Sequence, residues 1–234
     1  MQNIDRGLLH RAFSVFLFNK EGKLLLQKVR IFPPPAFTLF YYLLENICYL
    51  VFCPQRSRVK ITFPSYWANT CCSHPLYNET EMEERDALGV KRAAQRKLQH
   101  ELGIPKDELP LECFKFLTRV HYKAADEHPW GEHEIDYVLI ARPPKDVTLS
   151  NLNENEVEQV KYFDRHELRQ WMNSTGENRE LVSPWFQIIE GSLLQNWWDA
   201  LEKDLKNCKS IDDPSSELNK WIEPDMIHRA GAFK

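Results

Sequence analysis

One helical run with strand-like runs on both sides constrains the fold of this chain most. From Glu81 to Gly103, apolar residues recur at helical spacing, and Gly103 is a typical C-terminal stop. Runs of strand-forming residues lie before and after it, at 12–18, 24–27, 113–122, 134–141 and 157–163. The first two runs, joined by a turn at 19–23, predict a hairpin. Further helices are expected at Arg165–Met172 and Ser183–Leu205. Strands gathered around one long helix predict a mixed α/β domain, with a sheet packed against helices.

One segment, Lys28–Pro54, does not fit this pattern. It contains three consecutive prolines and then an almost continuously apolar run at 37–53. The run is shorter than the ~20 apolar residues that a membrane-spanning helix needs, and Glu45 lies near its centre. A membrane span, a buried extension of the first hairpin and an insertion foreign to the fold stay open. We expect one domain over residues 1–208 that carries 28–54 as a foreign insertion, with a linker and C-terminal tail at 209–234.

Charge and cysteine content limit the partners and the compartment. The chain has 234 residues, a formal net charge of −4 and a pI near 6.1, so it lacks the overall basic character of nucleic-acid-binding proteins. Its six cysteines do not have the spacing of a disulfide framework, and no signal peptide pattern precedes the first strand-like run. We therefore expect a reducing, cytoplasmic location and no nucleic acid partner. We also expect a monomer without a membrane partner.

The stretch Asn69–Pro75 places a thiol two residues before an imidazole. If side chains alternate there as in a strand, Cys72 and His74 project to the same side. A thiol beside an imidazole can act as a nucleophile, an acid or a metal ligand. The alternative is that Cys71 and Cys72 are two small buried hydrophobic residues.

A second stretch, Trp130–Tyr137, places two carboxylates two residues apart at the start of a strand. Glu132 and Glu134 then share one face, and neighbouring carboxylates require a cation or a shared proton. The thiol, the imidazole and the carboxylates together predict a metal and acid–base site. The basic loop Arg56–Lys60 precedes this site in the chain and favours an anion-binding role.

Several stretches occur in the order found in one enzyme family. They are Gly7–Ser14, Cys72-Ser73-His74-Pro75, Arg92–Arg96, Glu101–Ile104, Gly131-Glu132-His133-Glu134 and Ser183-Pro184-Trp185. Through them the chain resembles the type I isopentenyl-diphosphate delta-isomerases of the animal kind, which have the Nudix fold. The resemblance extends from Gly7 to Arg229, apart from Lys28–Pro54.

The resemblance implies interconversion of isopentenyl and dimethylallyl diphosphate in isoprenoid biosynthesis. It implies Cys72 as the catalytic cysteine and Glu134 as the acid–base group that also contacts a metal. The implied metal ligands are His10, His74, Glu132 and Glu134, with Glu101 binding a magnesium ion shared with the diphosphate. The implied substrate contacts are Tyr122 and Trp185 near the hydrocarbon, and Arg56, Lys60, Ser73 and Lys97 around the diphosphate. The implied cofactor is a divalent metal: magnesium, with zinc or manganese as alternatives at the His/Glu ligands.

The residue types agree with this chemistry. Protonating an alkene creates a tertiary carbocation, which aromatic faces stabilise by cation–π attraction. Protons enter and leave at different carbons, so two proton-transfer groups are needed, here a thiol and a carboxylate. A hydrolytic Nudix helix resembles Arg-Glu-x-x-Glu-Glu-x-Gly, whereas Arg96–Gly103 keeps only the last carboxylate. Too few acidic ligands remain to activate water with several metal ions, so a Nudix hydrolase is disfavoured.

The ends of the chain differ from the family pattern. Family members carry an N-terminal extension with a further histidine ligand and a lysine, and no histidine precedes His10 here. Some end in a peroxisomal tripeptide, whereas this chain ends with Ala230–Lys234, which does not resemble that signal. A catalytically impaired paralogue that binds diphosphate or a partner is therefore the alternative to an active isomerase.

Overall fold

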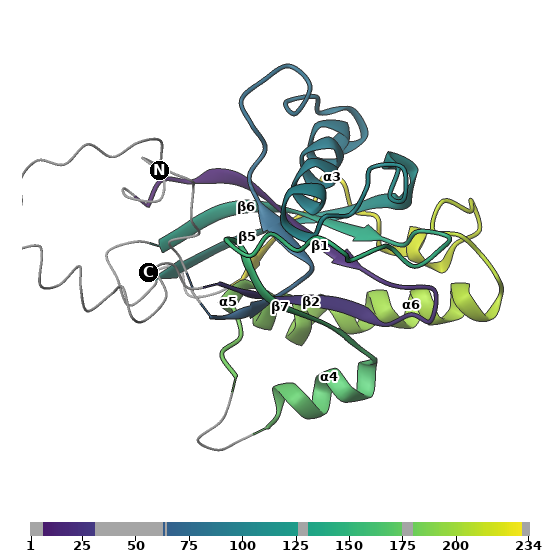
Figure 1. Cartoon of the computed structure of the whole chain (residues 1–234). Helices are drawn as coiled ribbons and strands as arrows, with labels where there is room; N and C mark the ends of the chain where they lie inside the picture. The colour runs from purple at the N-terminus through teal and green to yellow at the C-terminus, as the bar shows by residue number, and fades with distance from the viewer. Residues whose placement is uncertain (1–6, 31–62, 64, 126–130, 175–179, 231–234) are drawn as a thin grey trace, which may run out of the picture.

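The computed structural model of the chain describes residues 7–30, 63, 65–125, 131–174 and 180–230 (Figure 1). The basic loop with Arg56 and Lys60 lies outside the described residues, as does the predicted insertion from residue 31 onward. Lys28 and Val29 belong to a strand, so the first residues of the predicted insertion 28–54 are part of the sheet. Among the described residues, no helix is both long and apolar enough to cross a membrane.

A five-stranded mixed sheet carries the residues of interest. In spatial order its strands are β4 (Cys71–Ser73), β1 (His10–Leu17), β6 (Gly131–Ala141), β5 (Phe114–Ala125) and β8 (Ile227–Ala230). Strand β1 pairs in parallel with β6 and antiparallel with β4, and β5 pairs antiparallel with β6 and in parallel with β8. The strand β8 comes from the segment expected to be linker and tail; the domain division at residue 208 stays a prediction.

A second, three-stranded sheet has the order β3 (Trp67–Ala68), β2 (Leu24–Val29) and β7 (Val157–Phe163). The predicted hairpin at 12–27 is wrong in one respect: β1 and β2 belong to different sheets, and an isolated antiparallel bridge joins Phe18, just after β1, to Leu24. Both strands are buried along most of their length. Each therefore needs cover on both faces, which a two-stranded ribbon cannot provide.

Helix α3 (Leu88–Leu102) follows a short 3-10 turn, η1 (Arg85–Ala87). The predicted stop is confirmed: Gly103 has φ +68°, and its N–H donates to the carbonyls of Leu98 and Gln99. The helix begins at Leu88 and not at Glu81 as predicted: residues 81–84 form a turn and a short irregular stretch, and η1 follows them. Its buried face packs on the side of β1 that carries Phe13, Val15 and Leu17.

The C-terminal helices cover the opposite side (Figure 1). Helix α4 (Arg165–Met172) has the predicted bounds and begins with a capping box between Asp164 and Glu167. The single helix predicted at 183–205 is divided into α5 (Pro184–Ile189), a π-helical turn η3 (Glu190–Leu194) and α6 (Gln195–Lys206). Two 3-10 turns, η2 (Leu111–Cys113) and η4 (Glu217–Trp221), complete the elements. The predicted mixed α/β architecture is confirmed.

Candidate active site

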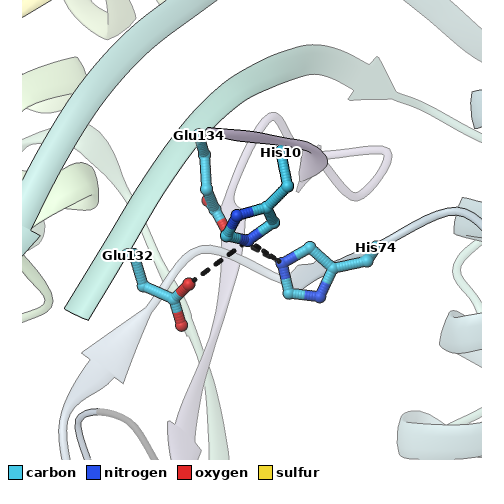
Figure 2. A group of neighbouring side chains, drawn as sticks. All are labelled: His10, His74, Glu132 and Glu134. Atoms are coloured by element: carbon cyan, nitrogen blue, oxygen red, sulfur yellow. Dashed lines mark hydrogen bonds and ion pairs between the residues drawn. The ribbon is translucent and has the colours of Figure 1, made fainter. Parts of the chain in front are cut away.

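Four side chains from three strands converge at one end of the large sheet (Figure 2). His10 begins β1, His74 follows β4, and Glu132 and Glu134 lie on β6. One ligand atom from each lies within 4.8 Å of all the others. The parallel register pairs His10 with Glu134, so the strands themselves bring the stretch Gly7–Ser14 next to the stretch Gly131–Glu134. We call these four residues the His/Glu group.

The distances within the His/Glu group are those of direct contact. The Nε2 atom of His10 is 3.2 Å from His74 Nε2, 3.3 Å from a Glu134 oxygen and 3.6 Å from a Glu132 oxygen. His74 Nε2 is 2.7 Å from the same Glu134 oxygen. The other ring nitrogen of His10 donates to the Leu8 carbonyl at 2.7 Å, which leaves Nε2 facing the group.

Burial and mutual contact shift the proton affinities of this group. Burial alone would raise the pKa of Glu134, but hydrogen bonds from His10 and His74 outweigh it and hold that pKa well below its usual range. Burial alone would lower the pKa of His10, but Glu132 and Glu134 raise it to about 10. The two carboxylates thus stabilise a positive charge on His10. Two imidazoles and two carboxylates in this arrangement could hold a metal ion instead of that proton.

The Cys72 thiol lies near the same face of the sheet. Cys72 pairs with Ser14 of β1, and Ser14 lies on the same face of β1 as His10, four residues earlier. The Cys72 side chain therefore lies on the face that carries His10, as the predicted alternation requires. The thiol donates to the Asn69 side-chain oxygen at 2.8 Å, and the Trp185 indole N–H lies 3.1 Å from both that oxygen and the sulfur. The Ser14 hydroxyl also donates to the sulfur at 4.0 Å, so polar neighbours on several sides hold the thiol in one orientation.

Two aromatic rings connect the thiol with the His/Glu group. Tyr122, opposite Glu134 in the strand register, donates its hydroxyl proton to a Glu134 oxygen. Burial, and then the charge of Glu134, raise the pKa of Tyr122 well above its usual value. Its ring centroid is 6.2 Å from that of Trp185, at an interplanar angle of 26°. Tyr122 and Trp185 form an aromatic wall, with Cys72 at one end and Glu134 at the other.

Comparison with known proteins identifies the family. The NUDIX domain model matches residues 50–186. Isopentenyl-diphosphate Delta-isomerase 1 of Bos taurus is 45% identical over 97% of this chain and 81% of its own length. The isopentenyl-diphosphate Delta-isomerase of Dictyostelium discoideum is 43% identical over 94% of this chain and 80% of its own length. The chain belongs to the isopentenyl-diphosphate Delta-isomerase family.

The predicted Nudix fold and the predicted isomerase resemblance are thus confirmed. Among solved structures, a MutT NUDIX hydrolase from Burkholderia pseudomallei matches with a TM-score of 0.43 and 14% identity, covering 79% of this chain and 98% of that one.

In this member of the isomerase family, Glu101 lies apart from the His/Glu group. It is fully buried at the end of α3, where one oxygen accepts from Gln27 at 3.0 Å and lies 3.6 Å from the Cys71 sulfur. Lys97 Nζ lies 2.9 Å from its other oxygen and 3.7 Å from Glu156. Of the residues expected around the diphosphate, the described ones are Lys97 on α3 and Ser73 on β4.

Sequence reasoning missed two buried polar residues of the site. Asn69 also donates to the backbone carbonyls of Val15 and Cys71, so it fixes the start of β4, the strand that carries the thiol. Asp136 is 1% exposed; burial and the Glu134 charge raise its pKa to about 8, against a smaller opposing effect of Ser14. The alternation of carboxylates at 132, 134 and 136 is a signal that could have revealed Asp136.

Proposed function

We propose that the chain interconverts isopentenyl and dimethylallyl diphosphate, the reaction for which its relatives are named. One observation carries this proposal: a thiol and a carboxylate stand at the two ends of one aromatic wall. Isomerisation requires proton transfer at two different carbons of a small hydrocarbon, and this arrangement suits that requirement. The proposed catalytic residues are Cys72, Glu134, Tyr122 and Trp185.

The proposed reaction is balanced in protons. One proton adds to the terminal carbon of the double bond, and the resulting tertiary cation loses another proton from the carbon nearer the diphosphate. The faces of Tyr122 and Trp185 stabilise the cation between these steps. Cys72 serves one carbon, and Glu134 with the Tyr122 hydroxyl serves the other. Because the reaction is reversible, each group donates in one direction and accepts in the other.

The donor set of the His/Glu group fits a divalent metal. Its imidazole nitrogens suit zinc and its carboxylates suit manganese, whereas magnesium prefers a set made of oxygen ligands alone, such as Glu101 and a substrate diphosphate. A cation held by His10, His74, Glu132 and Glu134 would supply positive charge beside Glu134 and so lower the proton affinity of the Glu134–Tyr122 pair. Lys97 and Ser73, with Arg56 and Lys60, are proposed to bind the diphosphate.

The alternatives have less support. A Nudix hydrolase would need carboxylates that hold metal ions around an attacking water. Glu101 is the one carboxylate kept from the hydrolytic helix pattern, and it is enclosed by Gln27, Cys71 and Lys97. This position suits an ion pair with Lys97 better than activation of water. The hypothesis of an impaired paralogue is supported only by the difference from the family's N-terminal histidine and lysine. The cytoplasmic location, the peroxisomal alternative and the monomeric state stay predictions.

Incubation of the purified chain with isopentenyl diphosphate in D₂O tests the function. The mixture contains a divalent metal and a thiol reductant, and NMR follows the products. We expect dimethylallyl diphosphate with deuterium in a methyl group, because the added proton comes from an exchangeable group of the protein. Released phosphate would indicate a hydrolase, and unchanged substrate would indicate an impaired paralogue.

A further inference from the structure

The face of β6 opposite the His/Glu group carries a histidine pair that the proposed chemistry does not use. His121 on β5 and His133 on β6 have their Nε2 atoms 3.0 Å apart. Their ring planes differ by only 17°, and their centroids are 5.2 Å apart. Since the nitrogens are much closer than the centroids, the rings meet edge to edge, as they do in an N–H···N hydrogen bond.

The backbone fixes the tautomer of His133. Its Nδ1 atom lies 3.1 Å from the Gly7 carbonyl oxygen, which can only accept, so Nδ1 carries a proton. In a neutral ring the Nε2 atom then accepts a hydrogen bond from the Nε2–H of His121. His121 thus orients His133, and His133 holds the carbonyl of Gly7.

Gly7 begins the short segment that leads into His10. Gly7, Leu8 and Leu9 are all exposed, so side-chain burial does little to fix this segment. Yet the Leu8 carbonyl accepts the Nδ1 proton of His10 and turns its Nε2 toward the carboxylates. The orientation of His10 therefore depends on a segment that His133 holds by a hydrogen bond.

Strand β6 contacts this segment from both faces. Glu132 and Glu134 lie on one face and contact His10, while His133, between them in sequence, points to the other face and contacts Gly7. We propose that His133 is a positioning residue for the His/Glu group: it fixes residues 7–9 and thereby aims His10 Nε2 at a bound cation. This inference rests on the metal role proposed for the group.

Two substitutions separate the contacts of His133. The amide N–H of His133→Asn lies near the former Nδ1 position and can still donate to Gly7, whereas the longer side chain of His133→Gln places its amide near Nε2. Zn²⁺ affinity by calorimetry and the visible spectrum of bound Co²⁺ report on the ligand set. We expect His133→Ala and His133→Gln to bind Zn²⁺ about 10-fold more weakly with an altered Co²⁺ spectrum, and His133→Asn to recover most of both.

A matched control and a double variant complete the test. Lys123, which is exposed and opposite His133 in the register, serves as the control, and Lys123→Ala should bind like the parent chain. In a His10→Ala background, His133→Ala should cause no further loss, because its effect passes through His10. Equal losses in both backgrounds, or an Asn variant no better than the Gln variant, would overturn the inference. The binding readout is independent of turnover, so a parent chain that binds metal but does not isomerise would refute only the proposed function.

Discussion

The two adjacent thiols of β4 face opposite sides of their strand. Cys72 contacts Trp185, whereas Cys71 is fully buried against the α3 side and lies near Glu101. Adjacent residues of a strand alternate in this way, so only one of the two can serve a site on either face. The alternative of two small buried residues fits Cys71 alone.

We therefore expect Cys72→Ala to reduce isomerisation by at least ~100-fold, because a proton-transfer group is lost. Its circular dichroism spectrum and its diphosphate binding should stay unchanged. Cys71→Ala should retain activity and lose about 1 kcal/mol of unfolding free energy from the small change in packing. Initial rates of dimethylallyl diphosphate formation and urea unfolding measure both. Equal loss of activity from the two substitutions would mean that the pair is structural.

The two glutamates of the His/Glu group should respond differently to added metal. Glu134 contacts both histidines and the Tyr122 hydroxyl, whereas Glu132 lies near His10. Glu134→Gln should stay inactive at saturating metal because it removes an acid–base group. Glu132→Gln should regain much of its rate as metal is titrated in, because metal binding is its main role. Full recovery of Glu134→Gln would remove its proposed proton-transfer role.

The turn between β4 and α3 is held by one buried carboxylate. Glu81 accepts the Leu76 N–H at 2.7 Å and binds the Arg96 guanidinium at 2.6 and 2.9 Å. Arg96 also reaches the carbonyl of His74, so the turn connects the helix with a proposed ligand. Burial alone would raise the pKa of Glu81, but Arg96 and the Leu76 N–H lower it below its usual 4.5.

A lowered folded-state pKa stabilises the fold above the unfolded-state value near 4.5, and that contribution is lost as the pH falls through the folded-state pKa. We expect Glu81→Gln to lose about 1–2 kcal/mol of unfolding free energy at pH 7. Below pH 4.5 the difference between parent and variant should shrink. Urea unfolding across this pH range measures it, and a constant difference would contradict the assignment.

Replacing two helical glycines by alanine should change the stability of the fold in opposite directions. A Cβ at Gly89 in α3 would lie 2.3 Å from the Glu81 carbonyl oxygen, whereas a Cβ at Gly191 in the π-helical turn would meet nothing within 4 Å. Gly89→Ala should destabilise the fold by about 1–3 kcal/mol through overpacking against backbone. Gly191→Ala should stabilise it by about 0.5 kcal/mol by restricting the unfolded chain. Thermal unfolding of both variants measures the contrast.

Local signals decided which elements could be predicted from sequence. The Gly103 stop is a short-range feature, and it is correct in the structure. The helix at Arg165–Met172 also has its predicted bounds, and the structure adds a local capping box between Asp164 and Glu167 at its start. The π-helical turn that divides 183–205 has no comparable local signal. The separation of β1 from β2 depends on burial of both faces, which a single strand pattern does not reveal. The contacts of Asn69 with Trp185 and of His133 with Gly7 join residues far apart in the sequence, so the spacing of residues could not predict them.

At the scale of the whole molecule, the predicted insertion can be tested by removal. Lys28 forms ion pairs with Glu158 and Glu180, so the deletion should begin after Arg30 and extend to Pro54. Loop-closure free energy changes by only about 0.6 kcal/mol per doubling of length, so the shorter loop should keep the fold. Removing the apolar run should reduce self-association. Light scattering and melting temperature measure these outcomes, and loss of folding would show that the segment contributes to the core.

The central position of β1 has a consequence for synthesis of the chain. Its parallel partner β6 follows more than 120 residues later, and residues on both faces of β1, such as Phe13 and Phe16, are fully buried at the end. At the ~5–20 residues per second of translation, β1 leaves the ribosome roughly 6–25 s before β6 exists. During that interval one of the most apolar strands of the protein has no partner on its β6 side. The first strand to be made is therefore among the last to be buried.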